Sequence, residues 1–322
     1  MKKEQTINIC FATDNNYAKY MGLALMSVLK SANNEDNLHF FILDNKIKEE
    51  EKEKIARLKK IKDFEITYIP INDDIFKNCH ANQKGLTLTA FARFLVPWLI
   101  EVDKLIYLDC DIFVRKSLAP LFNIDISNYY MAGAVDFAIK KSYLISKFND
   151  KTLPFNYINS GVLLINNKKW KTESIADSLF KYAGTHSEDL HYGDQDCLNY
   201  LLSSKTLKIS QTWNMRNHCY DPYLVNKQAN KAEIIAAQKD PAIRHFKPWR
   251  KNNISEFREE YIEMMKTSPW AEFTPKDDLS FINFIKILFK YWLRYPLCFL
   301  TPKFYIRVKH RGFKNTILGV ID

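Results

Sequence analysis

The chain carries two aspartates, Asp109 and Asp111, at the end of the apolar stretch "KLIYLDCDIFV". Side chains two apart on a strand point to the same side, so both carboxylates would face one point. Burying them is costly unless a cation pairs with them. Mg²⁺ or Mn²⁺ would suit such a site, because these ions prefer oxygen ligands and keep positions free for phosphate oxygens. The alternative is an ordinary strand-end turn, where Asp is common.

A second group of polar residues follows the first apolar run, in "FATDNNY". Asp14, Asn16 and Tyr17 stand directly before a predicted helix. An aromatic ring, an amide and a carboxylate could bind a base and a ribose. A helix cap made by Asp14 is the alternative interpretation.

Two later segments add further polar candidates. "HYGDQDCLNYLL" places Asp194, Gln195 and Asp196 at the start of a predicted helix, where the helix dipole also favours acids. "RHFKPWR" contains His245 and Lys247. The imidazole could complete a metal site and the ammonium could neutralise a phosphate, although a lone His is more often structural.

The composition excludes several classes of protein. The 322 residues include only eight glycines, and neither G-x-G-x-x-G nor G-x-x-x-x-G-K-[ST] occurs. A dinucleotide-binding domain or a P-loop ATPase is therefore not expected. The six cysteines show no C-x-x-C spacing, which argues against a zinc site and a disulfide framework and for a reducing compartment. The first apolar run is too short for a signal peptide, so we expect a cytoplasmic protein.

Short apolar runs alternate with helical patterns through residues 6–250. Strands are predicted at 7–13, 38–44, 64–71, 104–110, 130–136 and 160–166. Helices are predicted at 17–32, 48–61, 89–100 and 170–184. Several strands are continuously apolar, as in strands covered on both faces. This alternation predicts an α/β fold with a single Rossmann-like, mainly parallel sheet flanked by helices.

The C-terminal part of the chain has a different character. Residues 1–266 are predicted to form the main domain, and the proline-containing segment 267–279 a linker. Residues 280–322 hold eight Lys or Arg against one acid, whereas the preceding 279 residues have a net charge of only +3. We expect this basic, aromatic extension to form a helix on the inner-leaflet membrane surface rather than a spanning one. A helix packed on the main domain is the alternative.

Five blocks in a fixed order resemble the family 8 retaining glycosyltransferases. They are "FATDNNYAKYMGLALMSVL", "TAFARFLVPWLIEVDKLIYLDCDIFVRKSLAPLF", "INSGVLLINNKKW", "DQDCLNYLL" and "HFKPW". The chain is most similar to bacterial lipooligosaccharide galactosyltransferases and lipopolysaccharide core hexosyltransferases. The resemblance covers about residues 6–250, and residues 257–310 resemble the C-terminal extension of the core enzymes. It implies a GT-A fold, a UDP-galactose or UDP-glucose donor, a saccharide or lipid-linked saccharide acceptor, and Mn²⁺ with Mg²⁺ as the alternative.

The resemblance also implies roles for particular residues. The metal ligands would be Asp109, Asp111 and His245. The donor would be bound by Ala12, Asp14, Asn16, Tyr17, Arg93, Asn159, Ser160, Gly161 and Lys247. The catalytic group would be Asp136 and Asp194, which meet sugar hydroxyls, and Gln195, on the reactive face of the anomeric carbon.

One departure from the family keeps a second interpretation open. Family members have a longer, glycine-containing loop between this histidine and "KPW", whereas only Phe246 separates His245 from Lys247 here. A glycine would let the backbone approach a diphosphate closely. A non-catalytic protein that binds a sugar nucleotide or a glycan therefore remains the alternative. A nucleotidyltransferase is disfavoured because the N-terminal segment lacks a glycine-rich loop, and nucleic-acid binding because the main body is nearly neutral.

Overall fold

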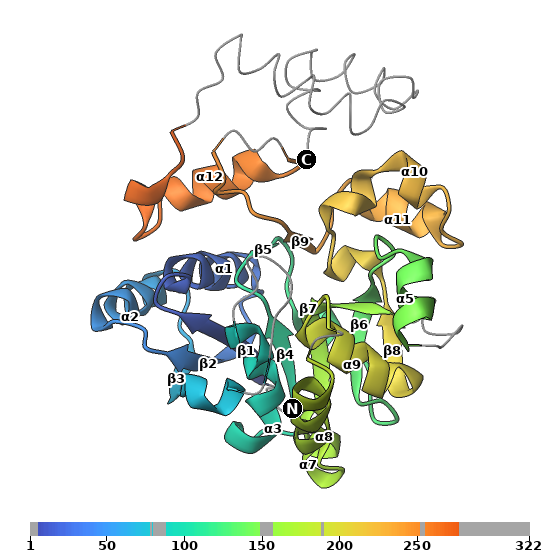
Figure 1. Ribbon diagram of the computed structural model, residues 1–322. Coiled ribbons are helices and arrows are strands. Elements are labelled where there is room, and N and C mark those ends of the chain that lie inside the picture. The colour runs from blue at the N-terminus through green and yellow to red at the C-terminus, as the bar shows by residue number, and fades with distance from the viewer. Residues whose placement is uncertain are drawn as a thin grey trace.

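The computed structural model describes residues 6–276 except 78, 80–87, 149–156, 188–189 and 252–254. The predicted basic extension, residues 280–322, lies outside the described residues. A seven-stranded sheet with the order β3-β2-β1-β4-β7-β6-β8 forms the centre (Figure 1). Its strands are β1 Thr6–Asp14, β2 Asn37–Asn45, β3 Glu65–Pro70, β4 Lys104–Leu108, β6 Met131–Val135, β7 Ile158–Asn166 and β8 Thr206–Ile209. All of them are parallel except β7, which confirms the α/β fold with a mainly parallel sheet.

Helices cover both faces of this sheet (Figure 1). The α-helices are α1 Ala18–Ser31, α2 Glu49–Ala56, α3 Val96–Leu99, α4 Ala119–Phe122, α5 Lys141–Phe148, α7 Asn167–Thr172, α8 Ile175–Thr185, α9 Asp194–Leu202, α10 Pro222–Val225, α11 Lys231–Ala237 and α12 Arg258–Lys266. Among the described helices, none is long and apolar enough to cross a membrane.

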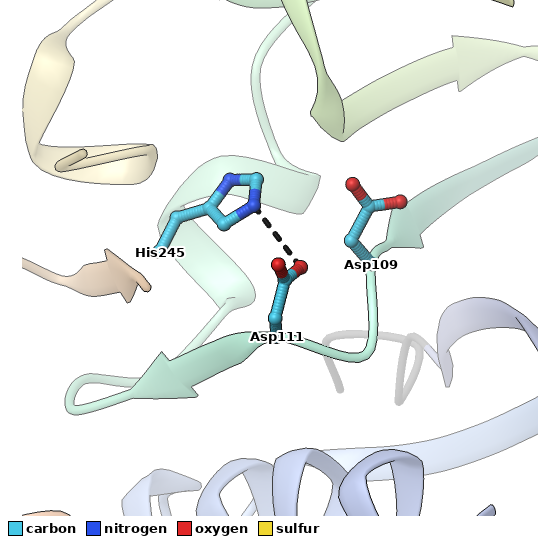
Figure 2. A group of neighbouring side chains, drawn as sticks. All are labelled: Asp109, Asp111 and His245. Atoms are coloured by element: carbon cyan, nitrogen blue, oxygen red, sulfur yellow. Dashed lines mark ion pairs between the residues drawn. The ribbon is translucent and has the colours of Figure 1, made fainter. Parts of the chain in front are cut away.

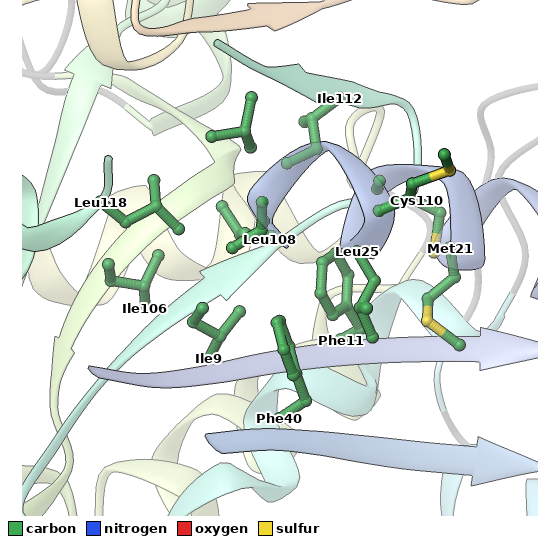
Figure 3. Packing of buried hydrophobic residues seen from close by; sticks show 14 of the residues in the cluster. Ile9, Phe11, Met21, Leu25, Phe40, Ile106, Leu108, Cys110, Ile112 and Leu118 are labelled. Carbon is green, nitrogen blue, oxygen red and sulfur yellow. The ribbon is translucent and has the colours of Figure 1, made fainter. Parts of the chain in front are cut away.

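Two hydrophobic cores lie on opposite faces of the sheet because successive strand side chains alternate in direction. On β1, Ile9 and Phe11 pack towards α1, whereas Cys10 packs on the other face with α3, α8 and α9. Figure 3 shows the first core, in which Met21 and Leu25 of α1 lie over the strands. The central strands are thus buried on both sides, which explains their continuous apolar runs.

Three predicted helices differ from what the sequence suggests. The segment predicted as a helix at 89–100 begins as a 3₁₀ helix, η3 Leu88–Leu95, before the short α3. The segment predicted at 170–184 divides into α7 and α8, because Ser174 has a positive φ of 47°. The helix predicted at 17–32 and all six predicted strands are present within two residues of their expected bounds, whereas the helix predicted at 48–61 is α2 followed by a 3₁₀ helix, η1 Arg57–Lys60.

The first part of the predicted linker packs onto the preceding domain. Trp270 is fully buried, and its indole N–H donates to Glu51 Oε2 at 2.7 Å. The ring lies against Gly22 of α1, where an added Cβ would lie only 2.1 Å from the indole carbon Cη2. Residues 267–276 are therefore part of the folded body and follow α12 across the α1 side of the sheet (Figure 1).

Candidate active site

A small second sheet brings the predicted metal ligands together. Asp109 follows β4, and Asp111 directly precedes β5 (Ile112–Val114). The strand β9 (Ile243–His245) pairs antiparallel with β5, so that Ile112 stands opposite His245. One ligand atom from each of the three side chains lies within 4.8 Å of the others (Figure 2). The prediction that Asp109 and Asp111 lie on one strand is wrong, because residues 110 and 111 form a turn after β4. The two carboxylates and the imidazole nevertheless converge.

The chemistry of these groups fits a hard divalent cation. Two carboxylates and one imidazole suit Mn²⁺ or Mg²⁺ better than thiolate-seeking metals. The intervening Cys110 does not compete, because burial raises the pKa of its thiol. Burial also raises the pKa of Asp111, but the charge and hydrogen bond of His245 and the charge of Lys247 lower it more, to about 2. His245 Nε2 is 3.1 Å from Asp111 Oδ1, and Lys247 Nζ is 3.8 Å from Asp111 Oδ2.

Gly161 at the start of β7 leaves the room in which these ligands meet. A Cβ on residue 161 would lie 2.3 Å from His245 Cε1 and 2.7 Å from Asp109 Oδ2. Such distances are shorter than any normal contact, so only glycine fits here without a shift of the two side chains. The Asp109 amide donates to the Gly161 carbonyl at 2.8 Å, which fixes the glycine beside the predicted metal ligands.

Arg93 joins the metal ligands to the start of α9. Its guanidinium is buried, with Nη2 2.9 Å from Asp109 Oδ1 and Nε 3.0 Å from Asp194 Oδ2. A third contact runs from Nη1 to the Ser160 carbonyl. Burial raises the pKa of Asp194 to about 6, although the charge of Arg93 opposes this shift. We call Asp109, Asp111 and Asp194, with Arg93, the carboxylate cluster.

A chain of amide side chains lies next to this cluster. Gln195 Oε1 accepts hydrogen bonds from Asn159 Nδ2 at 2.7 Å and from the Ser160 amide at 3.2 Å. Gln195 Nε2 donates to Asp136 Oδ2 at 3.3 Å. These side chains are buried. We call Asp136, Asn159 and Gln195, together with Asn214 described below, the amide network.

Three residues of the site were not predicted, and they come from one short segment. Arg216 Nη1 donates to Asp136 Oδ2, His218 Nε2 lies 3.9 Å from Asp136 Oδ1, and Asn214 Nδ2 donates to Asn159 Oδ1 at 2.8 Å. Although burial raises the pKa of Asp136, Arg216 and His218 lower it more. The segment belongs to no strongly periodic element; its only sequence signal is polar residues at every second position.

The four predicted nucleotide-contact residues lie at the neighbouring strand end. Since β1 and β4 are parallel neighbours, Ala12 and Asp14 reach the same edge of the sheet as Asp109. Cys110 Sγ lies 3.6 Å from the Ala12 carbonyl. Asp14 Oδ1 accepts from the Tyr17 amide at 2.9 Å in the turn before α1, but the N-cap of α1 is Tyr17 and has no side-chain cap, so Asp14 is not the helix cap. Asn16 is exposed. Their contact with a nucleotide stays a prediction.

Asp196, the other acid in the first turn of α9, is bound by tyrosine side chains and does not face the site. It is fully buried, and its carboxylate accepts hydrogen bonds from the Tyr157 hydroxyl at 2.6 Å and the Tyr143 hydroxyl at 3.1 Å. These contacts fasten α5 and the start of β7 to α9. Asp194 and Gln195 face the site, whereas Asp196 holds the helix in place.

Comparisons with known proteins agree with this architecture. The Glycosyl transferase family 8 sequence model matches residues 8–253. A Haemophilus influenzae protein with a glycosyltransferase name is 33% identical over 211 residues, which are 65% of this chain and 63% of that protein. The lipopolysaccharide 1,2-glucosyltransferase of Escherichia coli is 25% identical over 287 residues, covering 88% of this chain and 84% of that enzyme.

The solved structures point in the same direction. A crystal structure of the galactosyltransferase LgtC, in complex with donor and acceptor sugar analogues, matches with a TM-score of 0.73 and 26% identity. The match covers 82% of this chain and 96% of that one. The predicted GT-A fold and the resemblance to lipooligosaccharide and lipopolysaccharide transferases are thereby confirmed. This chain belongs to glycosyl transferase family 8.

Proposed function

We propose that this glycosyltransferase moves galactose or glucose from a UDP-sugar to a saccharide acceptor, with retention of the anomeric configuration. The convergence of Asp109, Asp111 and His245 beside Asn159 and Gln195, in a chain of this family, carries the proposal. The similar LgtC galactosyltransferase was crystallised with donor and acceptor sugar analogues. Those ligands support the same substrate classes here.

Asp109, Asp111 and His245 would hold Mn²⁺, with Mg²⁺ as the alternative. A bound divalent cation would act as a Lewis acid on the diphosphate of the leaving nucleotide. Lys247 stands 3.8 Å from Asp111 and brings a second positive charge to the same place. It would compensate for the short loop after His245, in which the Phe246 amide donates to the Asp111 carbonyl at 2.9 Å. A lysine beside the metal ligands would stabilise negative charge that develops on the departing phosphate.

Retention requires either a covalent intermediate on the protein or attack from the face that the phosphate leaves. Gln195 would be the nucleophile of a covalent route, but its Oε1 already accepts two hydrogen bonds, from Asn159 and from the Ser160 amide. Those donors occupy the lone pairs that would attack. We therefore favour front-face attack by the acceptor hydroxyl, with the departing phosphate taking its proton. Gln195 would position the reaction rather than bond to the sugar.

A variant at this position tests the route. We expect Gln195→Ala to retain roughly a few per cent of the wild-type rate, because a positioning group is missing but no bond-making atom is lost. Mass spectrometry of the protein after incubation with UDP-hexose should show no sugar adduct. A glycosyl group trapped on Gln195 or Asp194 would contradict the front-face route.

The function itself is tested with a panel of UDP-sugars. We expect Mn²⁺-dependent release of UDP from UDP-galactose or UDP-glucose, abolished by a chelator and restored by added Mn²⁺. An acceptor screen with lipooligosaccharide and lipopolysaccharide cores would then identify the second substrate. Binding of a UDP-sugar without any turnover, with every acceptor class, would instead support the non-catalytic alternative.

The acceptor class suggests a location for the enzyme. A similar enzyme is named for lipopolysaccharide, and a lipid-linked acceptor lies at a membrane surface. We propose that the basic extension, residues 280–322, holds this chain to the cytoplasmic face of the inner membrane, because anionic lipids attract Lys and Arg at about 1 kcal/mol each.

Vesicle sedimentation separates charge from apolar contact. Deletion of 280–322 should abolish binding to anionic vesicles while UDP release continues. Replacement of Lys286, Lys290 and Arg294 by Gln should weaken binding to anionic vesicles and leave binding to neutral ones unchanged. Full binding by the truncated chain would disprove the membrane role.

A further inference from the structure

Asn214 lies between the predicted metal ligand His245 and the amide network. Its side chain is almost completely buried, with 1% of its surface exposed. Asn214 Oδ1 is 2.9 Å from His245 Nδ1, and Asn214 Nδ2 donates to Asn159 Oδ1 at 2.8 Å. One amide thus contacts both halves of the site.

Two backbone amides determine which way the hydrogen bonds of this chain run. The Gly161 amide donates to Asn159 Oδ1 at 3.1 Å, so the atom there must be the oxygen. The Ser160 amide likewise donates to Gln195 Oε1. Because a backbone N–H cannot change places with an acceptor, the assignment of oxygen and nitrogen on both side chains follows from the network.

This direction extends to the imidazole. Asn214 must present its NH₂ to Asn159 Oδ1, so its oxygen faces His245 Nδ1. His245 Nδ1 therefore carries a proton, and Nε2 is the nitrogen that points to Asp111. From His245 to Asp136 each side chain donates to the next, in one direction.

We propose that Asn214 is a positioning residue that keeps the His245 proton on Nδ1, so that Nε2 can bind the metal ion, and that orients Asn159 towards Gln195. The proposal rests on the proposed metal-dependent function. A hydrogen bond to the second nitrogen of a ligating histidine commonly sets its tautomer and orientation. Here Asn214 also donates to Asn159, which in turn donates to Gln195.

Without Asn214 we expect the proton of His245 to move from Nδ1 to Nε2. Of the two acceptors beside the ring, only Asp111 Oδ1, 3.1 Å from Nε2, would then remain. A neutral imidazole would place its proton on Nε2 and donate to Asp111, which blocks the nitrogen that the metal needs. Asn214 opposes this tautomer, because its oxygen accepts a hydrogen bond from Nδ1–H.

The tautomer is measurable in metal-free protein by ¹⁵N NMR of the histidine side chains, with the His245 signals assigned from His245→Gln. We expect a protonated Nδ1 in the wild type and an unprotonated Nδ1 in Asn214→Leu. Asn214→Ala serves as the second variant if leucine prevents folding. The matched control is Asn167→Leu, since Asn167 is an equally buried amide that bonds to the Ile100 and Val102 carbonyls, away from the site.

The affinity for Mn²⁺, measured by the electron paramagnetic resonance signal of the free ion, gives a second readout. We expect binding to weaken about 10–100-fold in Asn214→Leu and to stay unchanged in Asn167→Leu. Asn214→Asp separates the two roles of the residue. Its carboxylate still accepts from Nδ1–H, so Mn²⁺ affinity should persist, but it cannot donate to Asn159, so kcat should fall about tenfold or more with KM for the donor less affected.

A wild-type Nδ1 signal and wild-type Mn²⁺ affinity in Asn214→Leu would overturn the proposal, as would full kcat in Asn214→Asp. Failure of the proposed function would look different. In that case the wild-type protein itself would neither bind Mn²⁺ nor release UDP, while the tautomer of His245 in the metal-free protein would still report whether Asn214 directs it.

Discussion

The carboxylate cluster and the amide network share one edge of the sheet but are built on different principles. In the cluster, Asp194 is paired with Arg93 by charge, yet its Oδ2 makes no hydrogen bond within the described residues, and its pKa is raised to about 6. In the network, Asp136 is equally buried and its Oδ1 likewise has no hydrogen-bond partner within the described residues, but its Oδ2 accepts from Arg216 and Gln195, and its pKa is lowered.

The difference indicates that a nearby cation alone does not keep the pKa of a buried carboxylate low. Arg93 divides its charge between Asp109 and Asp194, whereas Arg216 and the amides direct N–H groups at Asp136. Charge-assisted hydrogen bonds compensate for lost hydration better than proximity does. The cluster is left with excess negative charge, as a site for a divalent cation would be, whereas Arg216 and Gln195 direct their N–H groups at Asp136 Oδ2.

The largest effect on the contrast between the two regions is expected from removal of Arg93. Arg93→Met leaves two buried or half-buried carboxylates without their shared cation, so we expect the free energy of unfolding to fall by about 3–5 kcal/mol. Urea denaturation with and without Mn²⁺ measures the loss, and added metal should restore part of it. A loss below about 1 kcal/mol would show that Arg93 does not hold the cluster together.

The pH dependence of stability separates the two carboxylates. The folded-state pKa of Asp194 is raised to about 6. Its contribution to the free energy of unfolding is therefore complete below about pH 4 and is lost as the pH rises through about 6. In chelator, the wild type should lose up to about 3 kcal/mol over this range relative to Asp194→Asn. Asp136→Asn should show the opposite sign, since a lowered pKa stabilises at high pH and that contribution is lost on acidification. Equal slopes in the two variants would refute the contrast.

A third test fills the space that Gly161 leaves for His245 and Asp109 and affects only the predicted metal ligands. In Gly161→Ala the new methyl group would lie within 2.7 Å of both His245 and Asp109, so one of them must move. We expect Mn²⁺ affinity to fall about 10–100-fold, measured by titration calorimetry, with a small change in melting temperature. Gly133→Ala is the matched control, because its new methyl group would press on Ile158 and Leu163 instead of the predicted metal ligands. Unchanged affinity in the alanine variant at 161 would mean that the ligands do not meet there.

The smallest effect is expected for Arg216. Its side chain is about a third exposed, and Asp136 keeps its hydrogen bond from Gln195 when the guanidinium is removed. Arg216→Met should therefore cost only about 1–2 kcal/mol, less than Arg93→Met. Thermal unfolding of the two variants side by side measures the ratio. A cost equal to that of Arg93 would show that the amides do not satisfy Asp136.

Much of this protein could be predicted from local patterns. The continuous apolar runs determined six strands and the mainly parallel sheet, because a strand buried on both faces needs apolar residues at successive positions. The spacing of Asp109 and Asp111 at the end of one such run was enough to suggest a cation site. Charge alone separated the basic residues 280–322 from the nearly neutral body.

Contacts between distant segments decided the rest. His245 meets Asp111 only because β9 pairs with β5, two strands of three residues each that are too short to show a pattern. Arg93 shares its charge between Asp109 and Asp194, and Asn214 links His245 to Asn159, across gaps of tens of residues. Periodicity reports which face of an element is buried, but not which polar group on another element completes its hydrogen bonds. For that reason the ligand types could be predicted from the sequence, whereas their protonation and alignment depend on the tertiary structure.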